Sequence, residues 1–119
     1  MKYMLLIHQV DAPTPRDPEA WARLSEDEQR AVYASYQAIN QTPGVTPGLQ
    51  LAPPEASTTV RVEDGKTLTT DGPFVTVKEA LGGWLFYEAD DLDAAIELAA
   101  RIPAAWLGGA VEVRPVVER

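Results

Sequence analysis

Two turn signals place a β-hairpin in the middle of this chain. Residues 57–63 alternate in β-branched side chains, Asp64-Gly65 is a dipeptide typical of a tight hairpin turn, and residues 66–70 form the returning strand. That strand runs directly into Asp71-Gly72-Pro73-Phe74, where the proline fixes its own φ and pushes the preceding glycine out of the helical region. Any fold of this chain must therefore accommodate an antiparallel hairpin that ends at a second turn.

Hydrophobic periodicity predicts further strands on both sides of that hairpin. Residues 2–10 are apolar on both alternating faces, as in a central strand that is covered on each side. Residues 84–87 form another apolar strand, and residues 111–117 alternate, with Pro115 favouring an edge or a bulge. A short strand is also expected at residues 49–51.

Capping signals predict two helices. Ser25 is an N-cap, and Glu28 three residues later completes a capping box. Apolar residues then recur at helical spacing from 32 to 39 and should face a sheet. The second helix is capped at residue 90 or 91 and stops before Pro103.

Without the short segment at residues 49–51, the order of these elements is β-α-β-β-β-α-β, which is an α+β arrangement similar to the split β-α-β of ferredoxin-like proteins. We expect an antiparallel sheet with two helices on one face. The other face combines apolar central strands with charged outer strands, to which Arg61, Glu63, Glu112 and Arg114 contribute. Such a face is suited to pairing with a second copy, so we expect a homodimer that encloses a cavity.

The size of the chain predicts a single domain over residues 1–119. With 119 residues and 45% hydrophobic content, it can bury a core without disulfides or a structural metal. It has no cysteine, which excludes thiolate catalysis and cysteine-ligated zinc or iron–sulfur clusters. One histidine and scattered carboxylates also make a transition-metal site unexpected. We therefore expect no cofactor.

Charge and hydropathy exclude two classes of partner. The net charge is −8 and no basic stripe interrupts it, so nucleic acid is not an expected partner. No apolar stretch approaches the length needed to span a membrane. The expected location is the cytoplasm.

Long stretches of the sequence are similar to one known family. They are residues 1–8, 59–62 through 71–74, 78–79, 81–83, 91–93 and 109–115. On these residues the chain resembles the YCII-related family, specifically its subgroup named for the Asp-Gly-Pro-Phe (DGPF) motif. The resemblance implies a protomer of the dimeric α+β barrel superfamily, with two sheets packed face to face and a cleft near the first strand. It also implies metal-free chemistry on small, often aromatic, molecules, and a genetic association with alternative sigma factors.

His8 and Asp71 are the candidate catalytic residues. His8 is the single histidine, lies at the end of the first expected strand, and carries an imidazole able to act as general acid or base near neutral pH. The resemblance implies a His–Asp active site, in which Asp71 would orient or charge His8 across the cleft. The alternatives are that His8 is a partly exposed strand-end residue and that Asp71 only caps its turn.

A second set of residues is a candidate for binding substrate. Arg61 and Arg114 carry guanidinium groups that match planar anions such as carboxylates. Charged residues on outer strands more often pair with neighbours, here Glu63 and Glu112. The remaining candidates of this set are Thr70, Phe74, Lys78 and Glu79.

Two positions depart from the family pattern. Members of the family usually carry glutamate where this chain has Thr76, and often a basic residue where it has Trp106. If that glutamate is an essential acid, Glu79 is the nearby replacement, and it lies next to Lys78, where ion pairing would hold it ionised.

Two functions follow from these observations. The first is a cofactor-independent lyase or isomerase that moves a proton on a small polar or aromatic substrate in a dimer cavity. The second is a non-catalytic ligand-binding or regulatory module, linked to sigma-factor-dependent transcription. His8 and Asp71 favour the first, and the lack of a complete catalytic set favours the second.

Overall fold

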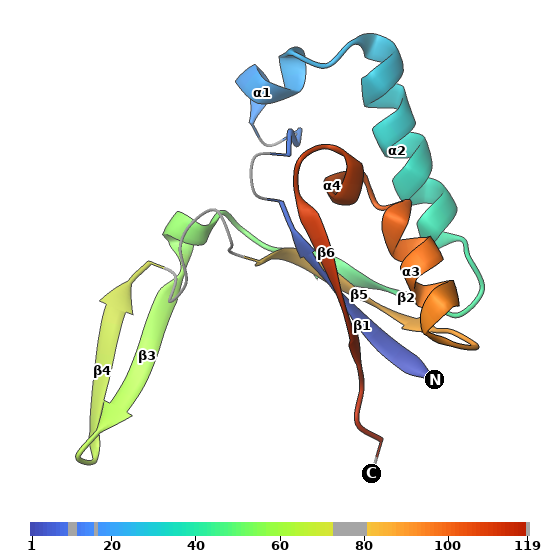
Figure 1. Cartoon of the computed structure of the whole chain (residues 1–119). Coiled ribbons are helices and arrows are strands. Elements are labelled where there is room, and N and C mark those ends of the chain that lie inside the picture. The colour runs from blue at the N-terminus through green and yellow to red at the C-terminus, as the bar shows by residue number, and fades with distance from the viewer. Residues whose placement is uncertain (10–11, 16, 73–80, 119) are drawn as a thin grey trace.

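The computed structural model describes residues 1–9, 12–15, 17–72 and 81–118. Its main element is a four-stranded antiparallel sheet with the strand order β2-β5-β1-β6 (Figure 1). This is the strand order of a ferredoxin-like domain, so the predicted α+β class is confirmed. The strands are β1 (Lys2–His8), β2 (Val45–Gln50), β5 (Leu81–Glu88) and β6 (Ala110–Pro115).

The helices pack on one face of this sheet, as predicted. Side chains from α2 (Glu26–Asn40) and α3 (Leu92–Ala100) join one hydrophobic cluster with alternate residues of β1. Short helices α1 (Pro18–Ala22) and α4 (Pro103–Trp106) precede α2 and follow α3. The cluster includes Tyr3, Leu5, Ile7, Ile39, Leu85, Leu98, Ala99 and Ile102.

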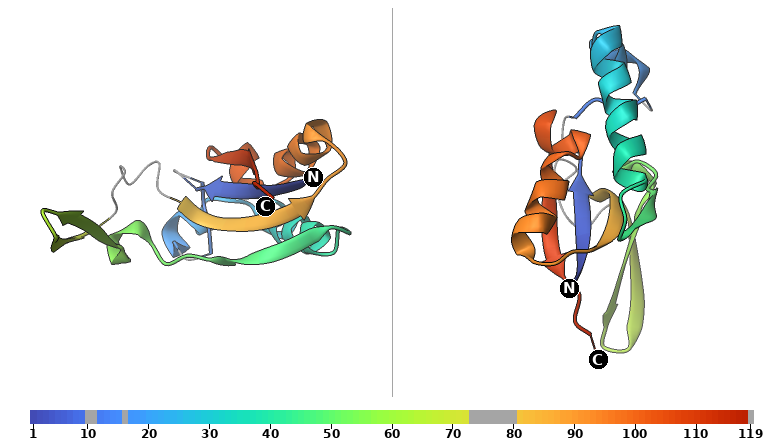
Figure 2. Two further views of the ribbon diagram at one scale, coloured as in Figure 1. Left: turned by 90° about the horizontal axis from the view of Figure 1, so that it is seen from below. Right: turned by 90° about the vertical axis from the view of Figure 1, so that its right-hand side faces the viewer.

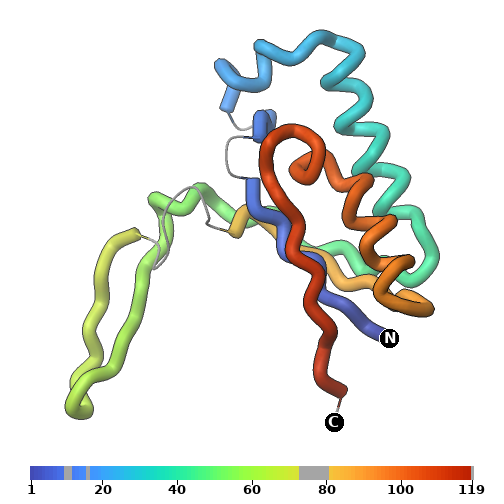
Figure 3. Tube along the Cα trace, viewed as in Figure 1, coloured from blue at the N-terminus to red at the C-terminus, as the bar shows by residue number. Residues whose placement is uncertain are grey.

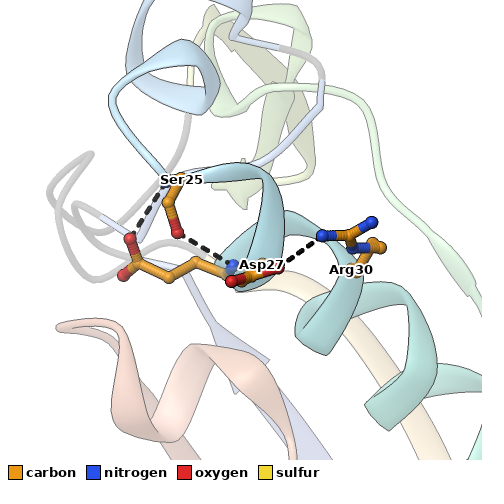
Figure 4. Close-up of polar contacts among 4 residues, drawn as sticks. Ser25, Asp27 and Arg30 are labelled. Atoms are coloured by element: carbon orange, nitrogen blue, oxygen red, sulfur yellow. Dashed lines mark hydrogen bonds and ion pairs between the residues drawn. The ribbon is translucent and has the colours of Figure 1, made fainter.

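Local chemistry explains where the helices begin. The Ser25 hydroxyl accepts a hydrogen bond from the Glu28 backbone N–H at 3.1 Å, and the Glu28 carboxylate accepts one from the Ser25 N–H at 3.0 Å (Figure 4). In the same turn Arg30 pairs with Asp27. The expected capping box is therefore present. Pro103, however, begins α4 rather than merely ending α3, because a proline fits the first turn of a helix.

Strand β2 is longer than expected and begins earlier. The segment before residue 49 contains Pro47 and Gly48, residues that usually interrupt a strand, yet it pairs with β5. β2 is an edge strand, so a proline there need not break a ladder. A side chain at Gly48 would collide with the backbone and the indole of Trp84, so glycine lets the two strands approach.

The predicted hairpin forms, but it lies outside the main sheet. Among the described residues, strands β3 (Thr58–Glu63) and β4 (Lys66–Asp71) pair only with each other, and they extend away from the body of the molecule (Figures 1 and 3). Asp64 and Gly65 adopt φ values of 51° and 74°, as the two central residues of a type I′ turn require. A one-turn helix, η1 (Pro54–Ala56), precedes the hairpin. The expectation that Arg61 and Glu63 lie on outer strands of the main sheet is therefore wrong.

The projecting hairpin makes the molecule wide and thin, with extents of 51 × 43 × 18 Å (Figure 2). Its radius of gyration is 16.1 Å, whereas a compact domain of this length has about 13.5 Å. Among the described residues, no helix has both the length and the apolar character that a membrane crossing requires.

Candidate functional site

A cavity of about 280 Å³ lies between α2 and the ends of the sheet strands. The end of β1, the middle of α2, the glycines of β2 and β5, and α4 all contribute to its wall. Most of that wall is apolar. Residues that define it include Ile7, Gln9, Tyr33, Tyr36, Leu49 and Leu107.

The periodicity of the surrounding elements creates this cavity. Ile7 belongs to the core-facing set of β1, and Gln9, two residues later, lies on the same side. On α2, Val32, Tyr36 and Asn40 follow each other at four-residue spacing and so form one line along the helix. Gly83 of β5 leaves room in the wall, since a Cβ atom there would meet no atom closer than 3.8 Å.

Tyr36 is a polar residue of the cavity wall whose pKa is shifted by its surroundings. Burial raises the pKa of its hydroxyl above the ordinary value, and a hydrogen bond with the Gln9 side chain partly offsets that increase. The hydroxyl is therefore protonated near neutral pH and available as a donor. None of the described residues that line the cavity carries a charge.

The opposite face of the sheet holds a second set of side chains. Met4 and Leu6 alternate with the core residues of β1, and in the register they lie opposite Phe86 and Trp84. The two aromatic rings contact each other edge to face at 5.6 Å. The Lys2 ammonium lies 5.2 Å from the centre of the Phe86 ring. Of the three aromatic residues of β5, only Tyr87 packs against the core.

His8 lies on this second face, away from the cavity that its neighbours line. Its Nε2 atom is 3.7 Å from Oε1 of Glu112, and the two side chains are 25% and 43% exposed. Glu112 also pairs with Arg114, two residues along the same strand β6 (Ala110–Pro115) rather than across the sheet. Sequence patterns did not indicate Glu112 as a neighbour of His8, because only the β1–β6 register brings them together.

Asp71 is the last residue of β4, opposite Thr58, so it belongs to a different sheet from His8. The predicted His8–Asp71 pairing stays a prediction. The turn after Asp71 is held by the Gly72 N–H, which donates to the Ser57 carbonyl at 2.7 Å. The Thr59 hydroxyl also donates, to the Gly72 carbonyl, at 2.8 Å.

The substrate-binding candidates are spread over the molecule. Arg61 and Thr70 lie in the hairpin, opposite Leu68 and Thr59 respectively, whereas Arg114 lies on β6 of the main sheet. Phe74, Thr76, Lys78 and Glu79 lie outside the described residues. Within the described part of the chain, no cluster of three or more histidine or carboxylate side chains is arranged to hold a metal ion.

Comparison with known proteins relates this chain to a family, to a curated relative and to a solved structure. A family model for the YCII-related domain matches residues 1–119. An uncharacterised protein, R00369, of Rhizobium meliloti (strain 1021) is 31% identical over 119 residues, which cover 98% of this chain and 92% of the relative. Among solved structures, 5-chloro-2-hydroxyhydroquinone dehydrochlorinase (TftG) from Burkholderia phenoliruptrix AC1100, in complex with 2,5-dihydroxybenzoquinone, is 15% identical with a TM-score of 0.48. That match covers 100% of this chain and 96% of the other.

Proposed function

This chain belongs to the YCII-related family, and from that premise we propose that it is a small-molecule-binding protein that acts as a homodimer. The observation that carries the proposal is the cavity between α2 and the sheet. Its volume of about 280 Å³ is close to the lower end of the range for ligand sites. A molecule with a single ring would fit inside it.

The lining supports a ligand that is mostly apolar and has a few hydrogen-bonding groups. Most of the lining side chains are aromatic or aliphatic, and Tyr36 with Gln9 forms one polar element among them, beside those of Thr14, Asn40 and Gln50. Because the Tyr36 hydroxyl keeps its proton near neutral pH, it is suited to donate to a carbonyl or hydroxyl oxygen of the ligand. Phenols and related neutral aromatic compounds have this chemistry.

The face of the sheet opposite the helices supports the homodimer. Met4, Leu6, Trp84 and Phe86 form its centre, and both long helices lie on the other side of the sheet. Apolar surface of this kind is typical of an interface. Pairing of two such faces would give the dimeric α+β barrel of the DGPF subgroup, in a cytoplasmic protein.

A second candidate function is acid–base chemistry of the lyase or isomerase type at that interface. The 3.7 Å contact between His8 and Glu112 favours it, because a carboxylate beside an imidazole can orient it as a general base. Asp71 of the same or of the second protomer is a further candidate to act on His8. A non-catalytic or regulatory protein would require the cavity alone.

The two candidates are distinguished by comparing Tyr36→Phe with His8→Gln. Phenol, hydroquinone and benzoate serve as probes in ligand-observed NMR titrations of the full chain. If ligands occupy the cavity, Tyr36→Phe weakens phenol binding roughly two- to twelvefold, the loss of one hydrogen bond, and His8→Gln leaves it unchanged. The reverse pattern would support the site at His8. Absence of binding by all three probes, or binding insensitive to both substitutions, would refute the proposal.

A further inference from the structure

The β3–β4 hairpin, residues 58–71, which we call the arm, is almost entirely exposed. In its two strands Thr59 alone is partly buried, and every other residue is exposed. None of these residues belongs to the buried core. Figures 1 and 2 show the arm extending beyond the edge of the main sheet. An isolated two-stranded hairpin is at best marginally stable in water. The arm therefore needs a surface on which to pack.

The two faces of the arm differ in chemistry. On one face, which we call the valine face, Val60 and Val62 lie opposite Thr69 and Thr67. Val60 and Val62 are 60% and 67% exposed. The other face carries Arg61, Glu63, Lys66 and Leu68. This division into an apolar face and a charged face is typical of an antiparallel pair that buries one side and exposes the other.

The molecule exposes more surface than one folded chain of its mass requires. Its accessible surface is 8032 Å², whereas a compact 13.0 kDa monomer exposes about 6,300 Å². The difference is about 1,700 Å². A stable interface of standard size needs about 800 Å² from each partner. The surplus is therefore enough for an interface that includes the arm.

We propose that the arm docks through its valine face onto a second copy of this chain. The inference rests on the homodimer of the proposed function and adds to it a segment that reaches across to the partner. A second copy is favoured because a two-fold pair buries both arms at once and so removes the surplus surface symmetrically. The chemistry of the valine face opposes a nucleic acid or an anionic membrane as the occupant, because it has no basic residue and ends at Asp71.

Thiol labelling of single-cysteine variants tests this proposal, because the natural chain contains no cysteine. Val62→Cys reports on the valine face, and Leu68→Cys, on the other face of the same hairpin, is the matched control. Maleimide labelling rates are measured over a dilution series, with sedimentation velocity on the same samples to give the dimer dissociation constant. Circular dichroism verifies that both variants fold.

If the arm docks as proposed, Val62→Cys reacts about fivefold more slowly at about ten times the dissociation constant than in dilute solution. The reason is that mass action leaves only about a fifth of the chains monomeric at that concentration. Leu68→Cys should react at the same rate throughout. As a second measurement, Val60→Lys should raise the dissociation constant at least tenfold, whereas Leu68→Lys should change it less than about twofold.

Three results would overturn the proposal. Equal labelling of the two cysteines in samples that sediment as dimers would show that the arm is free, although the dimer itself would stand. Protection of both cysteines would show that the valine face is not the specific contact. Monomers at every concentration would remove both the arm contact and the dimer, while ligand binding in the cavity is tested separately by the probe titrations.

Discussion

Replacing Gly48 with alanine should separate strand β2 from strand β5 and disturb the wall of the cavity. A Cβ atom at this position would lie 2.5 Å from Cε3 of the Trp84 indole and closer still to the Trp84 carbonyl oxygen. Carbon atoms in contact are normally 3.5–4.0 Å apart, so the strand or the ring must move by at least about 1 Å. The carbonyl belongs to the backbone, and a change of rotamer cannot relieve that collision.

The expected cost follows from these contacts. Overpacking against a fixed neighbour costs about 1–3 kcal/mol, and losing one β2–β5 hydrogen bond adds about 1 kcal/mol. Alanine in place of glycine within a strand stabilises the folded state by about 0.5–1 kcal/mol, because the unfolded chain then has less conformational freedom to lose on folding. The net decrease in the free energy of unfolding should therefore be about 1–3.5 kcal/mol.

Gly83→Ala is the matched control, because Gly83 also lines the cavity and pairs with β2. Its Cβ would lie 3.8 Å from the Leu49 carbonyl oxygen and 3.9 Å from Cδ1 of Ile7, which are ordinary contact distances. Urea unfolding followed by far-UV circular dichroism should give a midpoint lowered by about 1 M for Gly48→Ala, and a midpoint that is unchanged or raised for Gly83→Ala. Equal midpoints for the two variants would refute the reasoning.

Three further predictions concern stability. Leu5 is fully buried, so Leu5→Ala should lower the free energy of unfolding by about 2–5 kcal/mol in urea titrations, and a smaller loss would contradict its place in the core. Ser25→Ala removes half of the capping box and should cost about 1 kcal/mol, measured as a lower Tm, whereas no change would mean that the cap is dispensable. Burial raises the pKa of Tyr36 in the folded state above its ordinary value of 10.0. The contribution of this group to the free energy of unfolding should therefore be fully present below pH 10.0 and be lost as the pH rises through the pKa of Tyr36 in the folded state. Tyr36→Phe should flatten this alkaline decrease, and an unchanged slope would assign it to other groups.

Much of the fold could be predicted because its signals are local. The Asp64-Gly65 turn depends on the φ preferences of two adjacent residues, and the cap at Ser25 depends on residues within one helical turn. The boundaries of β2 could not be predicted in the same way. Proline and glycine usually interrupt a strand, and only its edge position and the close approach to Trp84 make Pro47 and Gly48 acceptable there.

The candidate site was less accessible from the sequence. His8 was identified because it is the single histidine, but its contact with Glu112 depends on the register of β1 with β6. Gln9 and Tyr36 carried no sequence signal for a shared site, since Tyr36 was one member of an apolar helix stripe. Their hydrogen bond exists because the fold brings Tyr36 of α2 and Gln9, which follows β1, to the wall of the same cavity.

The sequence by itself determined the type of the main strands and of the two long helices, since periodicity, caps and turn residues act over a few neighbouring positions. It also determined that the chain carries the motifs of the YCII-related family. Only the tertiary structure decided that the hairpin leaves the main sheet as an arm, that His8 faces away from the cavity, and that Tyr36 lies within it. These facts depend on strand pairing and helix packing between residues far apart in the chain, which local preferences do not specify.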